Sequence, residues 1–318
     1  MTTVRHSSPL PTSTPPTADR PSAPRRRGPG RRPFAGSGSL FVLPFLSLFA
    51  LFLVVPIGYG VWMSLTDSSL TGLGDDRFIG FDNYAEALAD PQVWDTLGVT
   101  LLFTVLASVP LILVALGMAV LVNTGLPGQW LWRLSFFAPF LLPVAVVTMV
   151  WSWLFQPELG LLNDLLGYLR ADDVGWLIDE DVALLSVALV SVWWHVGFNF
   201  LLYLAALQSI PDHLYEAAAI DGAGAWRRLW SVTLPQLRRV TGVVGVLQIL
   251  ASLKVFDQIY LLTQGGPNGA TRSVLVYVYD TGFTGYRLGY AAAISYVFFA
   301  IIIVLSIAQM KFVSRGED

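Results

Sequence analysis

The chain has 318 residues, of which 54% are hydrophobic and 13% are charged, whereas an ordinary soluble domain carries about 25% charged residues. It has no cysteine and three histidines, which excludes disulfides, thiolate nucleophiles and cysteine-based metal sites. The composition therefore predicts an all-α polytopic membrane protein in the lipid bilayer. The small net charge of -3 gives no reason to expect a nucleic-acid partner.

Residues 1–39 differ from the rest of the chain. They are rich in proline, serine, threonine and arginine, and such a segment cannot bury enough apolar surface to become ordered. We predict a disordered, basic cytoplasmic tail. A signal peptide is the competing interpretation, but the apolar run that follows is too long for one and lacks a small-x-small cleavage site.

Six apolar runs are long enough to cross a bilayer, which takes roughly 20 residues. They cover residues 40–63, 97–122, 132–155, 182–207, 239–262 and 288–312, and 40–313 is the predicted transmembrane domain. Single prolines within the runs are tolerated in membrane helices and are expected to kink them. They are Pro44, Pro56, Pro110, Pro139 and Pro143.

The distribution of basic residues predicts the orientation, because cytoplasmic segments of membrane proteins are enriched in Lys and Arg. With both termini inside (N-in, C-in), 14 of the 19 basic residues fall in cytoplasmic segments. The loop 156–181 is then outside and is acidic. It is equally consistent with a solvated charge cluster and with a contact surface for an extracytoplasmic protein. We expect a multi-pass protein of the cell (inner or plasma) membrane.

The cytoplasmic loop 208–235 lies between predicted helices 4 and 5. A short helix is expected from Pro211 to about Ile220, then a bend at Gly222 and Gly224, then a second helix before Pro235. In that second helix one face carries Trp226, Leu229 and Trp230. Such a loop could lie on the inner leaflet or dock onto another protein.

The residues of this loop also carry a family resemblance. Glu216-Ala217-Ala218, Gly222 and Val232-Thr233-Leu234-Pro235 resemble the EAA loop of binding-protein-dependent ABC importer permeases. The resemblance implies that the loop forms coupling helices that dock into an ATPase subunit. The implied coupling residues are Glu216, Ala217, Ala218, Asp221, Gly222, Ala223, Trp226, Leu229 and Pro235.

The chain has no ATPase motif of its own. No G-x-x-x-x-G-K-[ST] sequence occurs, and the only lysines are Lys254 and Lys311, so no phosphate-binding lysine is available. We therefore predict a transporter subunit, not an enzyme. It holds no cofactor, and ATP-Mg is expected on a separate ATPase chain. Neither a membrane-enzyme constellation nor the paired midplane acids of a secondary carrier is visible.

Two further segments narrow the class. Gly80-Phe81-Asp82-Asn83-Tyr84 and the stretch from Phe256-Asp257 through Gly265-Gly266-Pro267 to Thr271 resemble the carbohydrate-importer permeases of the maltose and glycerol-phosphate type. The resemblance runs from about residue 40 to the C-terminus. It implies a heterodimer with a sister permease, an ATPase dimer and an extracytoplasmic sugar-binding protein. An ABC importer permease for a non-sugar solute is the alternative.

Polar residues on two predicted spans indicate a pathway, because polar groups inside a membrane tend to face a wet cavity. Ser191, His195 and Asn199 recur every four residues, as do Gln248, Ser252 and Phe256. The candidate pathway residues are Trp194, His195, Phe198, Asn199, Gln248, Ser252 and Phe256. Hydrogen bonding between helices is the alternative role for the polar members. Lys254 and Asp257, three residues apart, are predicted to form an ion pair.

Overall fold

The computed structural model describes residues 37–72, 76–125, 127–169 and 172–315, and within these ranges the only extended pairing is two isolated β-bridges. All other regular structure there is helical, as an all-α protein requires. The predicted basic tail lies outside the described residues up to position 36. Helix α1 (Ser37–Phe49) starts three residues before the predicted first span, which begins at residue 40.

The chain divides into two compact units at Val54. The described part of the first unit holds α1 and the π-helical turn η1 (Ala50–Val54). The second unit holds the rest, in this order: α2 (Val55–Ser64), α3 (Asp82–Ala89), α4 (Pro91–Asn123), α5 (Gln129–Phe137), η2 (Ala138–Leu141), α6 (Val144–Leu154), α7 (Leu161–Tyr168), α8 (Glu180–Gln208), α9 (Asp212–Ile220), α10 (Ala225–Arg228), η3 (Leu229–Thr233), α11 (Leu234–Leu253), α12 (Asp257–Leu262), α13 (Val274–Tyr279), η4 (Asp280–Thr284) and α14 (Leu288–Arg315).

Four helical stretches among the described residues are long and apolar enough to cross a membrane: Val42–Ser64, Pro91–Asn123, Glu180–Gln208 and Leu288–Lys311. A fifth exists if α5–η2 and α6, which meet at 98°, together make one broken span. Helix α11 is not among them. The protein is therefore polytopic and helical, while the sixth predicted span remains a prediction.

The most extensive helix–helix contact in the second unit is the one between α4 and α8. Ala115 and Ala119 of α4 are fully buried in one apolar cluster with Phe200 and Tyr203 of α8, and Ala107 is fully buried in another with Val187 of α8. Small side chains let the two helix backbones approach closely. Close van der Waals packing then stabilises the pair in a bilayer, where there is no hydrophobic driving force between helices. This pair forms the frame on which α11 packs.

The predicted span 132–155 is bent far more sharply than a kink. Pro139 and Pro143 have no N–H to continue a helix, and Pro143 is extended with ψ of 145° as the N-cap of α6. Helix α8 holds the break in place through the Trp194 indole N–H, which donates to the Leu142 carbonyl at 3.1 Å. Gly197 allows this approach, because a Cβ there would overlap the Phe136 carbonyl oxygen.

The predicted span 239–262 is also broken. Helix α11 ends at Leu253, and α12 begins at Asp257 after Phe256, whose φ of -137° and ψ of -63° are not helical. Side chains at the break therefore point differently from those of a continuous helix.

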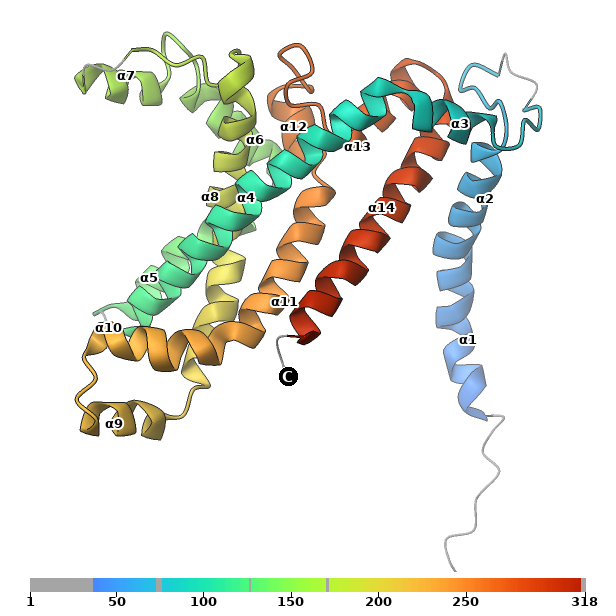
Figure 1. Ribbon diagram of the computed structural model, residues 1–318. Helices are drawn as coiled ribbons and strands as arrows, with labels where there is room; N and C mark the ends of the chain where they lie inside the picture. The colour runs from blue at the N-terminus through green and yellow to red at the C-terminus, as the bar shows by residue number, and fades with distance from the viewer. Residues whose placement is uncertain (1–36, 73–75, 126, 170–171, 316–318) are drawn as a thin grey trace, which may run out of the picture. The chain divides into compact units, whose positions relative to one another are not determined.

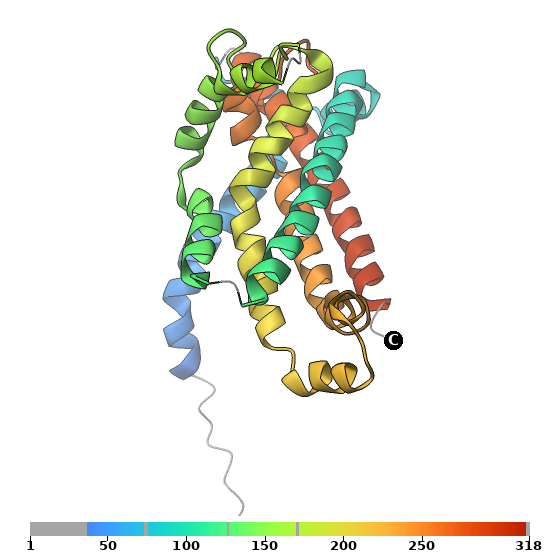
Figure 2. The same cartoon turned by 90° about the vertical axis from the view of Figure 1, so that its left-hand side faces the viewer.

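Figures 1 and 2 place α9 and α10 at one end of the second unit, beside the C-terminal end of α8 and the start of α11. We call this the loop end. Helices α7, α12 and α13 lie at the opposite end, which we call the far end.

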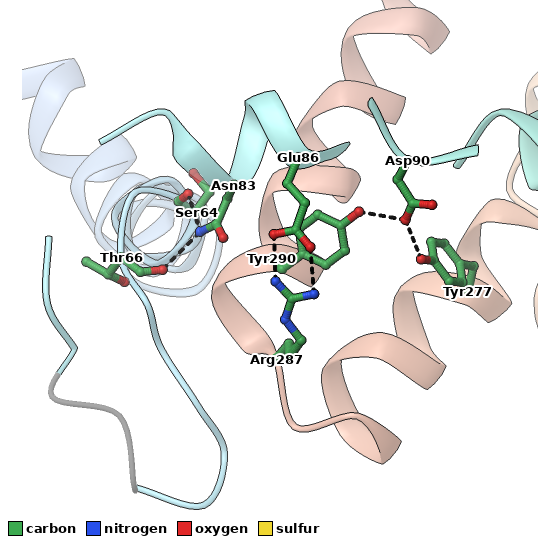
Figure 3. A network of polar contacts seen from close by, with 8 residues as sticks. All are labelled: Ser64, Thr66, Asn83, Glu86, Asp90, Tyr277, Arg287 and Tyr290. Atoms are coloured by element: carbon green, nitrogen blue, oxygen red, sulfur yellow. Dashed lines mark hydrogen bonds and ion pairs between the residues drawn. The ribbon is translucent and has the colours of Figure 1, made fainter. Parts of the chain in front are cut away.

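A polar network at the far end joins α2, α3, α13 and α14, and we call it the far-end clasp (Figure 3). The Asn83 amide donates to the carbonyls of Ser64 and Thr66 at 3.0 Å each. Glu86 and Arg287 form a bidentate ion pair at 2.8 and 2.7 Å. The segment Gly80–Tyr84 can be interpreted simply as a turn with aromatic packing. Through Asn83 it also ties the start of α3 to the end of α2.

Asp90 completes the clasp. Its carboxylate accepts the hydroxyls of Tyr277 and Tyr290 at 2.6 and 2.7 Å. Burial acts to raise the pKa of Asp90, but these hydrogen bonds, the Gln92 N–H and the charge of Arg287 outweigh it and lower the pKa. Burial and the neighbouring carboxylate raise the pKa of Tyr277 to about 12. The clasp therefore holds a charged Asp90 and a neutral Tyr277 at neutral pH.

Candidate functional site

A pocket with a volume of about 200 Å³ lies where α4, α8, α11 and α12 meet. Its lining combines aromatic rings with neutral hydrogen-bonding groups. The residues are Phe103, Ser191, Trp194, His195, Gln248, Ala251, Ser252, Lys254, Val255, Phe256, Asp257 and Gln258.

A chain of hydrogen bonds supports one wall of this pocket. The Asn199 amide donates to Gln248 Oε1 at 3.1 Å, Gln248 Nε2 donates to Ser252 Oγ at 3.1 Å, and Ser252 Oγ lies 3.1 Å from Ser108 Oγ. All four side chains are buried. The chain joins α8, α11 and α4, so the polar residues link the helices even where they also line the pocket.

His195 lies at the pocket among aromatic rings. Its Nδ1 is 3.0 Å from the Ser191 carbonyl, and since a carbonyl can only accept, Nδ1 carries a proton there. In the neutral ring, Nε2 is then left as an acceptor for a ligand hydroxyl. The ring centroid is 4.4 Å from that of Trp194.

The predicted pathway residues divide into two groups. Trp194, His195, Gln248, Ser252 and Phe256 all line the pocket. Phe198 does not, because it stacks on Phe140 with a centroid distance of 5.4 Å and is 40% exposed. Asn199 is buried behind the wall and acts on the pocket only through Gln248.

Lys254 and Asp257 both line the pocket but do not pair. Within the part of the chain that the structure describes, the ion pairs are those of Arg272 with Asp280 and of Arg287 with Glu86. The prediction assumed one continuous helix. Because the backbone breaks between the two residues, their side chains are not helical neighbours, and both remain exposed.

Sequence reasoning missed Gln258, which is buried at the pocket and accepts a hydrogen bond from Ser191 Oγ. Gln258 could have been selected because it is a polar residue directly after Phe256-Asp257. It was not selected because the prediction assumed that one continuous helix ran through this segment. Among the described residues no group of three or more His, Asp or Glu could hold a metal ion. The pocket is suited to a small polyhydroxylated molecule, whose C–H faces stack on rings and whose hydroxyls pair with amides and hydroxyls.

The loop at the opposite end of α8 has a defined turn. The Gly222 N–H bonds to the Ala219 carbonyl at 3.0 Å, and the Ala223 N–H bonds to the Ala218 carbonyl at 2.9 Å. These two bonds make a Schellman motif, in which the residue after the helix adopts a left-handed conformation. Gly222 has φ of 73°, which explains why glycine stands four residues after Ala218.

The two limbs of the loop are joined by the Tyr215 hydroxyl, 3.1 Å from Thr233 Oγ1. Sequence reasoning did not select this pair. Helix α9 ends at Ile220, as expected, but Pro235 does not end the second helix, since α10 and η3 continue into α11. Pro235 lies two residues after the end of the π-helical turn η3 (Leu229–Thr233), where the regular α-helical hydrogen-bond pattern is already interrupted.

The loop presents apolar side chains to its surroundings. Ile220 is 87% exposed, Trp226 72% and Trp230 59%, and the two indole rings lie 5.8 Å apart. Of the other predicted coupling residues, Glu216, Ala217, Asp221 and Pro235 are exposed and Ala218, Ala223 and Leu229 are half-buried. Exposed apolar clusters of this kind mark interaction surfaces.

Residues 111–315 match the family described as the binding-protein-dependent transport system inner membrane component. The chain belongs to this family. It is 36% identical to the probable ABC transporter permease protein YurN of Bacillus subtilis, covering 88% of this chain and 96% of that protein. It is 33% identical to the sulfoquinovosyl glycerol transport system permease protein SmoG of Agrobacterium fabrum, covering 88% and 90%.

Two other relatives bear on the class. The trehalose/maltose transport system permease protein MalF of Thermococcus litoralis is 33% identical, covering 87% of this chain and 93% of that protein. The sn-glycerol-3-phosphate transport system permease protein UgpA of Yersinia pestis is 35% identical over 87% and 93%. The chain is thus a membrane-embedded permease component of a transport system and not an enzyme.

The fold has a solved counterpart. A crystal structure of a bacterial ABC transporter involved in the import of the acidic polysaccharide alginate superposes with a TM-score of 0.76 at 24% identity, covering 87% of this chain and 94% of that one. The permease fold is therefore shared with a structure determined by experiment.

Proposed function

We propose that this permease is one membrane-spanning subunit of an ATP-driven ABC importer for sugars, and that it forms half of the translocation pathway. The observation that carries the proposal is the pocket shared by α8, α11 and α12, where Trp194 and Phe256 lie beside Gln248 and Ser252. Rings beside neutral donors and acceptors suit a sugar. Trehalose/maltose and sulfoquinovosyl glycerol, the cargoes named for two relatives, are sugars or glycosides.

The proposed orientation places the loop end in the cytoplasm. Arg133, Arg227, Arg228, Arg238 and Arg239 lie in segments at or next to that end. At the far end, α7 and the described loops on either side of it carry Glu158, Asp164, Asp172, Asp173 and Asp179. This asymmetry follows the positive-inside rule. It supports six spans with both termini inside, in which the bent α5–α6 pair and the α11–α12 pair each count as one.

The proposed partners follow from what the chain lacks. A sister permease would supply the other half of the pathway, an extracytoplasmic sugar-binding protein would deliver cargo, and an ATPase dimer would bind ATP-Mg. The exposed surface of Ile220, Trp226 and Trp230 is the proposed dock for the ATPase. Closure of the ATPase pair would then rock the two permeases about the pocket, by alternating access.

A non-sugar solute is the second candidate, since one relative is named for sn-glycerol-3-phosphate. Lys254 is the one Lys or Arg side chain among the residues that line the pocket, and Asp257 lines it too. A single lysine beside a carboxylate is a poor phosphate site. The neutral, aromatic lining therefore favours an uncharged sugar.

The dock is tested by co-purification. The chain is expressed with its partner chains, extracted in mild detergent and pulled down through a C-terminal tag. Trp226→Ala combined with Trp230→Ala should reduce the recovered ATPase at least tenfold, because buried tryptophans dominate interface energies. Trp153→Ala, which removes a 54% exposed tryptophan from α6, is the matched control and should leave recovery unchanged.

Membrane insertion is measured in the same samples by carbonate extraction. Full ATPase recovery with the double variant would rule out this surface as the dock. Loss of the chain from the membrane would instead assign the tryptophans to folding, and would count equally against a docking role.

A further inference from the structure

Helix α7 is held in place by Asn163, a buried residue in its first turn. The side-chain Nδ2 donates to the carbonyls of Pro157 and Val174 at 3.0 and 3.1 Å. Oδ1 accepts from the Trp176 indole N–H at 2.8 Å and from the Val174 N–H at 3.3 Å. An asparagine amide has two donors and two acceptor sites, so all of its capacity is used. These bonds fix which face of α7 turns toward the protein.

Helix α7 also begins directly beside the end of α6. The N–H of Gly160, the N-cap residue of α7, bonds to the Gln156 carbonyl at 2.9 Å. A Cβ on Gly160 would lie 2.5 Å from the Leu154 carbonyl oxygen at the end of α6, so only glycine allows this approach. Leu162 of α7 packs against the same apolar cluster as Trp194 of the pocket. The place of α7 is therefore set by α6, and its contacts reach the pocket wall.

The exposed surface of α7 has an apolar side and a polar side. Leu161, Leu165 and Leu169 recur every four residues, the last as the C-cap residue, and are 46%, 49% and 78% exposed. Residues four apart lie on one face of a helix, so the three side chains form one row, which we call the leucine stripe. Asp164 and Gly167 are exposed on the other side. An exposed apolar row of this kind marks an interaction surface.

Helix α7 lies crosswise at the far end, whereas α8 runs between the two ends (Figures 1 and 2). Exposed tryptophans lie at the same end. Trp62 is two residues from the end of α2, Trp94 is in the first turn of α4 and Trp153 is next to the last residue of α6, and all three are 46 to 54% exposed. Such tryptophans gather where a bilayer meets water. Since α7 begins beside the end of α6, it lies at this boundary.

We propose that α7 is an interfacial helix, and that its leucine stripe lies in the lipid leaflet at the far end while Asp164 faces water. The stripe continues the exposed apolar side of α6, where Met149 and Trp153 are 78% and 54% exposed on one half of a candidate broken span. This continuity favours lipid over a partner protein as the occupant. A crosswise helix with one apolar side is also the form that lies in a membrane surface.

The attachment of α7 is driven by apolar burial and not by charge. Helix α7 carries one acidic residue, Asp164, and no basic residue, whereas helices drawn to anionic lipid are rich in Lys and Arg. The stripe should therefore insert into a neutral bilayer. Through Leu162, a helix held in the leaflet also steadies the cluster that supports Trp194.

Quenching by spin-labelled lipid tests the proposal. The chain has no cysteine, so Leu165→Cys gives one site for the fluorophore NBD. The full-length permease is assembled with its sister permease and ATPase subunits in neutral phosphatidylcholine nanodiscs. Lipid with a nitroxide near the headgroup end of its acyl chain should lower the NBD emission at least twofold. Leu161→Cys repeats the measurement one turn away and should give the same result.

Asp164→Cys, the neighbouring residue on the polar side of α7, is the matched control and should lose less than half as much emission. Equal quenching at Leu165→Cys and Asp164→Cys, or none at Leu165→Cys, would overturn the proposal. An emission from Leu165→Cys that is blue-shifted but not quenched would mean that a protein chain covers the stripe, and would count equally against lipid.

A double variant tests whether the stripe itself holds the helix. Leu161→Gln with Leu165→Gln should reduce the quenching of NBD at Leu169→Cys at least twofold, while the recovered ATPase stays unchanged. Asp164→Asn should leave that quenching as it is. Undiminished quenching in the double variant would show that Asn163 alone positions α7, which contradicts the proposal. None of these measurements needs cargo or ATP, so their failure would leave the proposed importer function standing.

Discussion

Gly222 stands where the sequence predicts a bend, and the backbone there adopts a conformation that favours glycine. Its φ of 73° lies in the left-handed region, which costs a non-glycine residue roughly 1–2 kcal/mol. Gly222→Ala should therefore distort the turn between α9 and α10 and lower transport at least tenfold without removing the protein from the membrane. Gly222→Asn, which tolerates this region better, should retain more activity.

A matched control lies two residues away. Gly224 has φ of -66°, and a Cβ there would meet no other atom within 4 Å. Gly224→Ala should leave transport unchanged in the same vesicle assay. Equal loss in both variants would show that the loop tolerates no added methyl group at all, and that the left-handed turn is not the reason for Gly222.

Gln248 is the residue that links the helix frame to the pocket. Gln248→Leu removes its bonds to Asn199 and Ser252 and leaves the buried Asn199 amide without that acceptor. An unpaired buried group costs about 1–3 kcal/mol. We expect a KM for sugar uptake raised at least tenfold and a lower unfolding temperature in detergent. A lower unfolding temperature with unchanged KM would assign Gln248 to helix packing alone.

At the scale of elements, the far-end clasp has a predictable response to acid. The pKa of Asp90 is lowered in the folded chain, so its contribution to stability is present above the ordinary aspartate pKa of about 3.9 and is lost as pH falls through the lower folded value. The protection of α3 and the start of α14 against hydrogen exchange, taken relative to the intrinsic rate at each pH, should fall below about pH 4.

Asp90→Asn supplies the control for that prediction. An amide can still accept from one tyrosine but cannot titrate, so α3 should exchange faster than in the wild type at pH 7 and show no further acid step. An acid step of wild-type size in Asp90→Asn would show that Asp90 is not the titrating group.

Helix existence could be predicted from the sequence, but helix breaks could not. The apolar runs 182–207 and 288–312 end within three residues of the ends of α8 and α14, whereas α4 begins six residues before its run at 97. The sharp bend between Leu141 and Val144 depends on Gly197 of α8 and on the Leu142 carbonyl, to which the Trp194 indole donates. Those contacts are far apart in sequence, so local proline signals predicted only a kink.

The same limit applies to the candidate site. A period of four residues on a helix face was enough to select His195, Gln248 and Ser252, because the face is continuous there. It misplaced Phe198, which turns to Phe140, and it predicted an ion pair for Lys254 and Asp257 across a backbone break. Residue spacing along the sequence predicts which side chains share a face only where the helix is continuous, and it fails across a break such as the one between Leu253 and Asp257.

On the scale of the whole molecule, two surfaces at opposite ends have separate tasks in the proposed transporter. The loop end presents tryptophans to the ATPase, and the far end carries the clasp on the side where cargo enters. Helix α8 runs between them, since it bears Trp194 and His195 midway and leads into α9. A rigid α4–α8 frame would transmit movement of the loop to the pocket.

The most direct test of this account is sugar accumulation in proteoliposomes that contain this chain with its sister permease and ATPase subunits. The cargo is the tritiated sugar that saturates the cognate binding protein. The account predicts uptake that needs both ATP and the binding protein, and that falls at least tenfold with Gly222→Ala but not with Gly224→Ala. Accumulation by this chain alone, without ATP or the ATPase subunits, would contradict it.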